Sequence, residues 1–278
     1  MSKKIGFVGL GTMGFPMATN LKKAKFEVIG YDAFKGTYEK AGAAGITMMQ
    51  TLKEVAEQAD EAIISMVRDY AQNVDIIFGK NGLLSAHTKG KTIIVMSTLD
   101  PELMGELSKR VEAESDWKLV SAAVSGGASG AQAGTLSIMT SGAEDIVKSF
   151  KPYFDAIGSN TFYYGANPGN SQVAKLVNNM ILGITMNAVA EGLKLGEHYK
   201  LPEQEILNLL KVSTGDSWVV RNWGDVSKWT SETALAVLLK DLKSSFLEGI
   251  KHNVPLPFNA LSATQLFNSM GKEKPDAN

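Results

Sequence analysis

The stretch Ile5-Gly6-Phe7-Val8-Gly9-Leu10-Gly11-Thr12-Met13-Gly14 determines how the fold begins. A short apolar run ends at Gly9 and gives way to a helical pattern, so it predicts a strand, a tight turn and a helix. Gly9 permits the turn, Gly11 lets a pyrophosphate approach the backbone, and Gly14 allows close helix packing. The helix N-terminus that follows attracts an anion. We therefore predict a dinucleotide site at residues 9–14 rather than a purely structural turn.

An acidic residue stands at the distance from the glycines that such a site requires. Asp32 follows the second predicted strand, residues 26–31, about 20 residues further along the chain. Its carboxylate would accept hydrogen bonds from the adenosine ribose hydroxyls and repel a 2′-phosphate. We therefore predict NAD rather than NADP as the cofactor, although Lys35 could soften that preference.

The first half of the chain alternates strands with helices. Further strands are predicted at residues 62–67, at 92–96, around Leu119 and at 161–164. Helices are predicted at residues 51–59, at 143–154 and after Asp100, where Asp100 is the N-cap and Pro101 the first helical residue. Repeated units of this kind predict an α/β Rossmann domain, in which helices cover both faces of a parallel sheet.

No strand is predicted after Tyr164. Helices are predicted at residues 171–190, 203–212, 233–251 and 258–270, and the charged residues 271–278 predict a mobile tail. We place a domain boundary near Gly165. The Rossmann domain then spans residues 1–164, and an all-helical domain spans residues 165–278.

Composition excludes several kinds of site. The chain of 278 residues has no Cys, and its three His show no paired ligand spacing, so no metal site is predicted. Lys+Arg 28 against Asp+Glu 29 leaves no electrostatic footprint for nucleic acid or an acidic membrane. Neither a signal peptide nor an apolar run of about 18 residues is apparent. We expect a cytoplasmic protein whose partner is a small molecule, with no nucleic acid and no membrane.

One charge stands alone in the helix predicted at residues 171–190. Between Asp155 and Glu191 the only charged side chain is Lys175. The helix should be buried, because it is apolar on most sides through Val173, Leu176, Val177, Met180, Ile181 and Ile184. Lys175 lies in a polar stripe with Ser171, Gln172, Asn178 and Asn179.

Burial would lower the pKa of Lys175 toward neutrality, where a general acid or base works best. The alternative is a lysine that snorkels to the surface or pairs with a buried carboxylate.

Two other segments offer polar groups. Ser125, Gly126 and Gly127 lie in a run of small residues where backbone N–H groups could form an anion site, and a flexible crossover is the alternative. Lys240 and Asp241 are neighbours on the helix predicted at residues 233–251, a pairing that usually marks a solvated face.

These motifs together resemble the β-hydroxyacid dehydrogenases, which include 3-hydroxyisobutyrate dehydrogenase and tartronate semialdehyde reductase and are related to the 6-phosphogluconate dehydrogenases. The resemblance rests on residues 9–14, 17–21, 124–127, 134–139, 175–179 and 240–242, in the family's order and spacing. It implies a Rossmann domain joined by a long helix to an all-helical domain, with the active site in the cleft between them.

The resemblance also implies a role for each site residue. Lys175 is the general acid or base, Ser125, Gly126 and Gly127 hold the substrate carboxylate, and Asn178 and Asn179 support substrate binding. The implied cofactor contacts are Gly9, Leu10, Gly11, Thr12, Met13, Gly14, Asp32, Met66, Val67, Thr98 and Lys240. Ser121-Ala122-Ala123 and Val67-Arg68 depart from the family's Asp-Ala-Pro and Leu-Pro, which leaves the identity of the substrate open.

We therefore expect an NAD-dependent oxidoreductase, a homodimer or homotetramer, that interconverts a short 3-hydroxy carboxylate and its semialdehyde or ketone. A decarboxylating 6-phosphogluconate dehydrogenase would have a longer helical part. An imine reductase would typically lack Lys175. A non-catalytic NAD-binding sensor would need the glycines and Asp32 but not the polar stripe.

Overall fold

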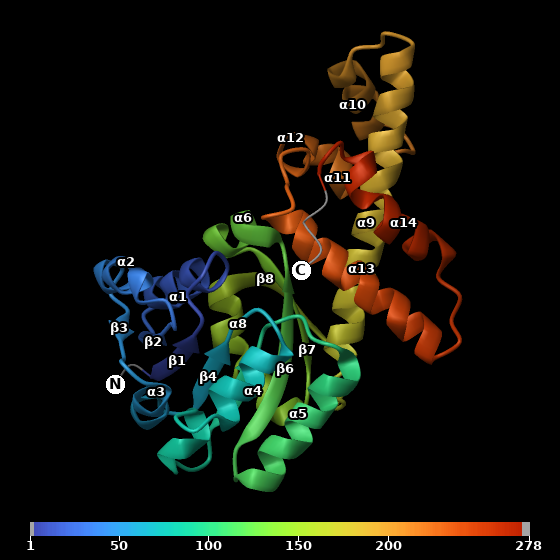
Figure 1. The fold of residues 1–278 in the computed structure, drawn as a ribbon. Helices are drawn as coiled ribbons and strands as arrows, with labels where there is room; N and C mark the ends of the chain where they lie inside the picture. Colours follow the sequence, from blue (N-terminus) through green and yellow to red (C-terminus); the bar gives the residue numbers. More distant parts are fainter. Residues whose placement is uncertain (1–2, 274–278) are drawn as a thin grey trace. The chain divides into compact units, whose positions relative to one another are not determined.

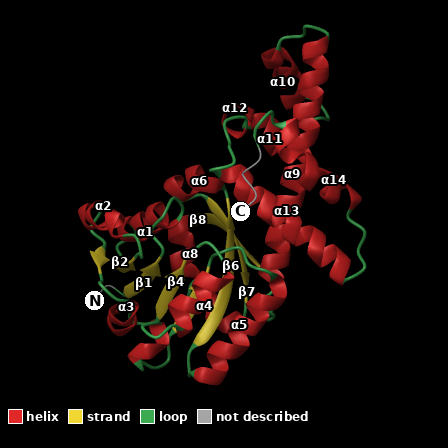
Figure 2. Cartoon of the chain, viewed as in Figure 1, coloured by secondary structure: helices red, strands yellow, loops and turns green. Residues whose placement is uncertain are grey.

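The computed structural model describes residues 3–273. By packing, the chain divides into two compact units, Met1–Lys175 and Leu176–Asn278. Among the described residues, all strands lie in the first unit, and the second unit is helical (Figure 2). The strands end near Gly165, where we placed the boundary, whereas the packing units divide further on, within helix α9 (Asn170–His198). Most of the predicted tail, residues 274–278, lies outside the described residues.

The first unit contains one eight-stranded sheet of order β3-β2-β1-β4-β5-β6-β7-β8 (Figure 1). The strands are β1 (Lys4–Val8), β2 (Glu27–Tyr31), β3 (Thr47–Met48), β4 (Ala62–Ser65), β5 (Thr92–Val95), β6 (Lys118–Ser125), β7 (Leu136–Ser141) and β8 (Gly158–Tyr163). Neighbours from β3 through β6 pair in parallel, which confirms the predicted Rossmann arrangement.

The expectation of a wholly parallel sheet is wrong at one edge. Strand β7 pairs antiparallel with β6, and β8 pairs parallel with β7. Only residues 126–135 connect β6 to β7. A parallel return needs a crossover of about a dozen residues or more, so this shorter connection suits an antiparallel neighbour.

Helices cover both faces of the sheet, as predicted. Successive side chains of a strand point to opposite faces. Phe7 of β1 belongs to one core with α1 (Gly14–Lys23), α6 (Gly127–Ala133), α7 (Glu144–Ser149) and α8 (Lys151–Ile157). Val8 belongs to the other core with α3 (Leu52–Gln58), α4 (Tyr70–Phe78) and α5 (Pro101–Glu114). The small helix α2 (Tyr38–Ala43) lies between β2 and β3 in the chain.

The predicted helix start at Asp100 is confirmed, and α3 has a capping box that was not predicted. The Asp100 carboxylate accepts hydrogen bonds from the N–H groups of Glu102 and Leu103, at 2.9 and 3.2 Å. Thr51 and Glu54 form a capping box at the start of α3. The single helix predicted at residues 143–154 is wrong, because Phe150 separates α7 from α8. Pro152 lies in the first turn of α8, where its missing N–H removes no hydrogen bond from the helix.

The second unit is built from α9, α10 (Glu203–Lys211), α11 (Trp218–Arg221), α12 (Trp223–Val226), α13 (Ala234–Lys251) and α14 (Pro257–Ser269). Its core takes Met186 and Leu193 from α9, Leu242 from α13 and Phe267 from α14. A Cβ atom on Gly183 would lie 2.7 Å from Cδ2 of Leu242, so this glycine permits the close approach of α9 to α13.

Helix α9 is less buried than its sequence predicted. Leu176 is 4% exposed, but Val173, Val177 and Ile181 are 46%, 46% and 56% exposed. Their spacing of four residues places the three on one helix face, so a single face of α9 stays open.

By length and composition alone α9 could also cross a membrane, with a mean hydropathy of 1.3 over its most apolar window, although polar residues interrupt its apolar run. Part of the helix is buried, and its first turn is hydrogen-bonded to the sheet, so we interpret α9 as a helix packed within the fold.

Candidate active site

The glycine-rich turn has the geometry that its sequence predicted. Gly9 has φ +91°, and a Cβ atom on it would lie 2.4 Å from the Met66 carbonyl oxygen. A Cβ atom on Gly14 would lie 1.9 Å from the Gly9 carbonyl oxygen, so both positions require glycine. A Cβ atom on Gly11 would meet nothing within 4 Å. The turn is thus closed at two glycines and open at the one expected to face a pyrophosphate.

The first turn of α1 carries no side-chain cap, since its N-cap residue is Met13. The first N–H groups of a helix have no partner within it, and the helix dipole favours a negative charge there. In α1, however, the Phe15 N–H donates to the Gly11 carbonyl at 3.0 Å and Pro16 has no N–H. The fit to a phosphate group of a dinucleotide therefore rests on the open space at Gly11 and on the helix dipole.

Asp32 is joined to this turn. Its Oδ2 atom accepts a 2.6 Å hydrogen bond from the Leu10 N–H, and its Oδ1 atom accepts one of 2.8 Å from the Phe34 N–H. Lys35 lies nearby in the chain but donates to the Tyr38 hydroxyl at 2.7 Å, with its Nζ atom 4.3 Å from the centre of that ring. The acidic residue therefore stands beside the dinucleotide turn while the nearest predicted cation interacts with a tyrosine.

The segments that follow β4 and β5 lie next to the glycine turn. The Met66 N–H donates to the Val8 carbonyl at 2.9 Å, and Met96 N–H donates to Ser65 at 2.9 Å. The Ser97 hydroxyl donates to the Val67 carbonyl at 2.6 Å. Consecutive parallel strands thus bring the predicted cofactor positions Gly9, Met66, Val67 and Thr98 to one edge of the sheet.

The Ser125–Gly127 segment adjoins the same edge at the end of β6, but the flexible loop considered for this segment is not what the structure shows. Ser125 ends the strand, Gly126 is the N-cap of α6 with φ +131°, and Gly127 begins that helix with φ +64°. A Cβ atom on Gly127 would meet nothing within 4 Å. Two successive glycines in the left-handed region therefore turn the backbone sharply and leave one side of it open.

Asn20 links the two glycine segments, and sequence reasoning gave it no role. Its buried side chain donates from Nδ2 to the Ala131 carbonyl of α6 at 2.8 Å. It is therefore a tether between α1, which follows the dinucleotide turn, and α6, which follows Gly126. The signal was present, since Asn20 belongs to the run 17–21 that carried part of the resemblance.

The first turns of α9 carry most of the predicted polar stripe. Ser171 and Gln172 are fully buried, Lys175 is 9% exposed and Asn179 is 6% exposed, whereas Asn178 is exposed. The Ser171 hydroxyl donates to Ser121 of β6 at 2.6 Å, so the helix start is fixed to the sheet. This contact also accounts for Ser121, which stands where the family pattern has an acid.

Within the second unit one buried carboxylate joins two predicted site residues. Asn179 Nδ2 donates to Asp241 Oδ2 at 2.6 Å, and Lys240 Nζ lies 3.1 Å from Asp241 Oδ1. Asp241 is fully buried while Lys240 is exposed, so the interpretation of this pair as a solvated face is wrong for Asp241. Asn178 joins this group through a 3.0 Å hydrogen bond to Asn179 Oδ1. Asp241 was missed because only its contact with α9 reveals its burial.

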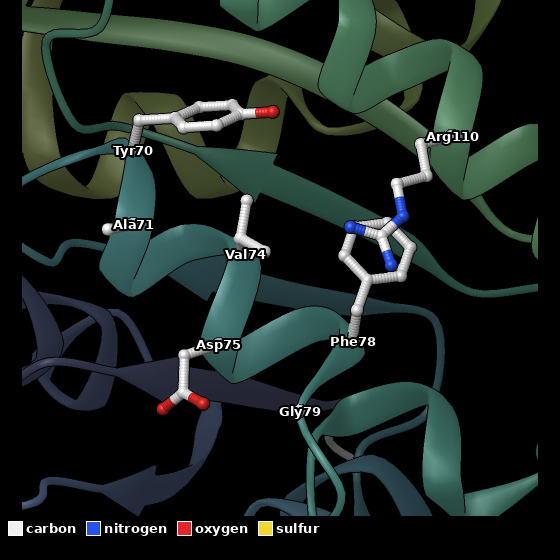
Figure 3. A pocket seen from close by; sticks show the side chains of 7 residues that line it. All are labelled: Tyr70, Ala71, Val74, Asp75, Phe78, Gly79 and Arg110. Atoms are coloured by element: carbon white, nitrogen blue, oxygen red, sulfur yellow. The ribbon is translucent and has the colours of Figure 1, made fainter.

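A pocket on the first unit lies elsewhere (Figure 3). It has a volume of about 420 Å³ and is lined by Tyr70, Ala71, Val74, Asp75, Phe78, Gly79 and Arg110. The guanidinium carbon of Arg110 lies 3.8 Å from the centre of the Phe78 ring (Figure 3). Since none of these residues belongs to the predicted site, this pocket is not where the sequence placed the chemistry. Within residues 3–273, no cluster of three or more His, Cys, Asp or Glu could hold a metal ion.

Two family models match the chain. Residues 4–165 match the NAD binding domain of 6-phosphogluconate dehydrogenase. Residues 169–278 match a second model, described as NAD-binding of NADP-dependent 3-hydroxyisobutyrate dehydrogenase. The two matches follow one another along the chain and meet just before α9.

Relatives with similar sequences are named as dehydrogenases of hydroxy acids. The mitochondrial 3-hydroxyisobutyrate dehydrogenase of Mus musculus is 38% identical over 214 residues, which are 77% of this chain and 63% of that protein. The alignment thus spans less than two thirds of that relative's length. The 2-(hydroxymethyl)glutarate dehydrogenase of Eubacterium barkeri is 34% identical over 96% of this chain and 88% of its own length.

Among solved structures, a Mycobacterium tuberculosis 3-hydroxyisobutyrate dehydrogenase with L-serine has a TM-score of 0.83 at 26% identity. The match covers 96% of this chain and 93% of that one.

Proposed function

Because this chain belongs to the β-hydroxyacid dehydrogenase family, we propose that it is an NAD-dependent oxidoreductase that interconverts a short 3-hydroxy carboxylate and its semialdehyde or ketone. One observation carries the proposal. The sheet edge that holds the open dinucleotide turn at Gly11 also anchors, through Ser121, the helix start that leads to the buried Lys175.

The residues of the turn fit a dinucleotide. The backbone of residues 9–14 would hold the pyrophosphate at the uncapped start of α1, and Asp32 would bind the ribose hydroxyls. Met66, Val67 and Thr98 would lie along the cofactor, and Lys240 beside its nicotinamide. When bound, the dinucleotide supplies hydride acceptance and donation.

We propose that Lys175 exchanges a proton with the substrate hydroxyl. In the oxidation direction the neutral amine accepts this proton as the alcohol carbon loses hydride and becomes a carbonyl, and in reduction the ammonium returns it. The backbone N–H groups of Ser125, Gly126 and Gly127 would hold the substrate carboxylate. Asn178 and Asn179 would contact the substrate beside Lys175, from the next turn of α9.

The preference for NAD rests on the surroundings of Asp32. A carboxylate at this position repels the 2′-phosphate of NADP. Lys35, the cation that could offset it, donates to Tyr38 and lies over its ring. We expect kcat/KM to be higher with NAD than with NADP, and a clear preference for NADP would overturn this assignment.

We also propose that the protein is a homodimer or homotetramer. The open face of α9 supports self-association, because Val173, Val177 and Ile181 form an exposed apolar stripe. Light scattering after size exclusion would measure the mass in solution, and Ile181→Glu should lower it if the stripe is covered by a second copy. A monomeric wild-type protein would refute self-association.

The reaction is tested with a panel of acids and NAD. The panel contains 3-hydroxyisobutyrate, glycerate, serine and threonate, and NADH absorbance reports turnover. Serine belongs in it because the Mycobacterium tuberculosis structure contains L-serine, a 3-hydroxy carboxylate. Lys175→Met is the matched inactive control. A protein that binds NADH but oxidises none of these acids, and reduces none of the corresponding carbonyls, would be a sensor instead.

A further inference from the structure

Both the oxygen and the nitrogen of the Gln172 side-chain amide bond to the connection between β5 and α5. Its side chain is fully buried in the first turn of α9. Its Oε1 atom accepts a 2.9 Å hydrogen bond from the Leu99 N–H, and its Nε2 atom donates to the Ser97 carbonyl at 3.1 Å. Both contacts are to backbone groups, on either side of Thr98. Gln172 therefore fixes the backbone of Thr98 from both directions.

The clamped segment is itself connected to the next predicted cofactor segment. The Ser97 hydroxyl donates to the Val67 carbonyl at 2.6 Å. Asn73, which is fully buried, donates to the Ser97 hydroxyl at 3.3 Å and to the Asp69 carbonyl at 2.8 Å. A displacement at residues 97–99 would thus be passed to Val67, because buried hydrogen bonds join the two segments.

Gln172 is not needed to attach α9 to the sheet. Ser171 provides a separate anchor, since its hydroxyl donates to Ser121 of β6 at 2.6 Å and its backbone N–H donates to the Ser141 hydroxyl of β7 at 3.2 Å. Gln172 adds one bond to the same Ser121 hydroxyl, at 3.0 Å. The contacts that distinguish Gln172 from Ser171 are therefore the two to the backbone around Thr98.

We propose that Gln172 is a positioning residue that sets the Thr98 segment against the turn of α9 that carries Lys175. Residues three apart on a helix lie on the same side of it, one turn from each other, so Gln172 and Lys175 share a face of α9. The inference rests on the proposed function for the roles of Thr98 and Lys175. In this proposal Gln172 acts through the backbone of residues 97–99 that it holds.

The test compares Gln172→Met with a matched variant of another buried amide. Met keeps the length of the side chain and removes both hydrogen-bonding groups around Thr98. Asn187 is the control position, because it is buried on the same helix and donates to Gly183 at 2.9 Å and Ser262 at 3.4 Å. Asn187→Leu therefore loses a buried amide in the second unit without touching residues 97–99.

Two readouts separate positioning from stability. We expect Gln172→Met to bind NADH more weakly than Asn187→Leu, measured by tryptophan fluorescence in the absence of substrate. We also expect kcat to fall about 10–100-fold, the effect of a misplacement of about 1 Å, at a melting temperature similar to that of the control. Gln172→Glu, which keeps the acceptor for the Leu99 N–H, should recover part of both losses.

Equal NADH affinity and equal kcat in Gln172→Met and Asn187→Leu would overturn the proposal. If Gln172→Met fails to fold, the same comparison with Gln172→Glu decides it. If the wild-type protein binds NADH but turns over no hydroxy acid, the proposed function fails. The fluorescence comparison still decides whether Gln172 positions the dinucleotide segment.

Discussion

Asn179 donates a 2.6 Å hydrogen bond from its Nδ2 atom to the Oδ2 atom of Asp241. The asparagine lies on α9 and the aspartate on α13, and both are buried. The other carboxylate oxygen of Asp241 lies 3.1 Å from Lys240 Nζ. A single buried carboxylate thus contacts the side chains of Asn179 and Lys240, to which the family resemblance gives roles in substrate and cofactor binding.

We expect Asp241→Asn to destabilise the protein by about 1.5–3 kcal/mol, the range for hydrogen bonds to charged groups. The substitution keeps the shape but removes the charge that Asn179 and Lys240 share. Urea unfolding measures the difference. Lys228→Met is the control, and it should cost at most about 1 kcal/mol because Lys228 and its partner Asp225 are 78% and 82% exposed. An Asp241→Asn variant as stable as the wild type would show that the carboxylate is not held as a charge.

Gly11→Val should separate cofactor binding from folding. A Cβ atom at Gly11 meets nothing within 4 Å in the protein, so the fold should tolerate the side chain, which would occupy the space proposed for the pyrophosphate. We expect an unfolding free energy close to that of the wild type and an NADH affinity lowered by about tenfold or more, or 1.4 kcal/mol.

The control for Gly11→Val is Gly105→Ala, a glycine on α5 with equally open surroundings. Alanine is the better helix former, so this variant should bind NADH normally and gain up to about 1 kcal/mol of stability. Unchanged NADH affinity in Gly11→Val would place the dinucleotide elsewhere.

Strands β4 and β5 could be predicted from sequence because each is a contiguous apolar run. Ile63 and Ile64 in β4 and Ile93 and Ile94 in β5 are fully buried, and such contiguous apolar runs are readily recognised. Strand β7 was missed although it is also buried. Its Ser141 hydroxyl donates to the Pro168 carbonyl at 2.8 Å, so a polar residue is buried there through a tertiary contact that local sequence cannot show.

Gly127→Asn should test the substrate segment without straining the backbone. Gly127 has φ +64°, a conformation that Asn tolerates, and a Cβ atom there meets nothing within 4 Å. We expect nearly unchanged stability and NADH affinity, with a raised KM for the hydroxy acid because the new side chain narrows the proposed carboxylate site. Steady-state kinetics with varied acid measure it.

The neighbouring Gly126→Val is a less specific test of the same segment. Gly126 has φ +131°, and its Cβ would lie 3.1 Å from Leu136 Cδ2, so strain would accompany any block. A wild-type KM in Gly127→Asn would indicate that the Ser125–Gly127 segment has only a structural role.

The parts of the site that consist of local sequence motifs could be predicted. The parts that depend on contacts between residues far apart in the chain could not. The turn at Gly9, the position of Asp32 and the polar stripe through Lys175 follow from spacing along one or two elements. The contacts of Asp241 with Asn179 join residues on different helices. Nothing local distinguishes Asp241 from an exposed aspartate, so only the folded structure shows its role.

Tyr153 should make stability depend on alkaline pH. Its hydroxyl is buried and donates to Glu61 Oε1 at 2.9 Å, and burial together with that carboxylate raises the pKa of Tyr153 well above its usual value. The unfolded chain therefore loses this proton first, near pH 10. The stability contributed by Tyr153 is present below about pH 10 and is lost as the pH rises further.

Tyr153→Phe should cost about 0.5–1.5 kcal/mol at pH 7 and lose stability less steeply above pH 10. Unfolding by urea at a series of pH values measures both effects. Tyr199→Phe, at a side chain that is 70% exposed, is the control and should follow the wild type. Parallel pH curves for Tyr153→Phe and the wild type would contradict the raised pKa.

Lys175→Met tests the proton transfer most directly. General acid–base catalysis by one group contributes roughly 10²–10⁴-fold in rate, so kcat should fall within that range. Methionine has a similar length and is apolar, so it can occupy the same buried position on α9 without leaving a cavity. NADH binding should persist because we propose that residues 9–14 hold the pyrophosphate.

The control for Lys175→Met is a second lysine on the same helix. Lys194 is exposed and donates to the Asn268 carbonyl at 3.0 Å, far along α9 from the polar stripe. Lys194→Met should keep wild-type kcat. A loss of kcat found only in Lys175→Met would then result from the position of Lys175 and not from the removal of a lysine charge as such. If Lys175→Met instead kept more than about a tenth of wild-type kcat, the loss would be smaller than general acid–base catalysis requires. The proton would then have to pass through another group, and Lys240, held beside Asp241, would be the next to replace.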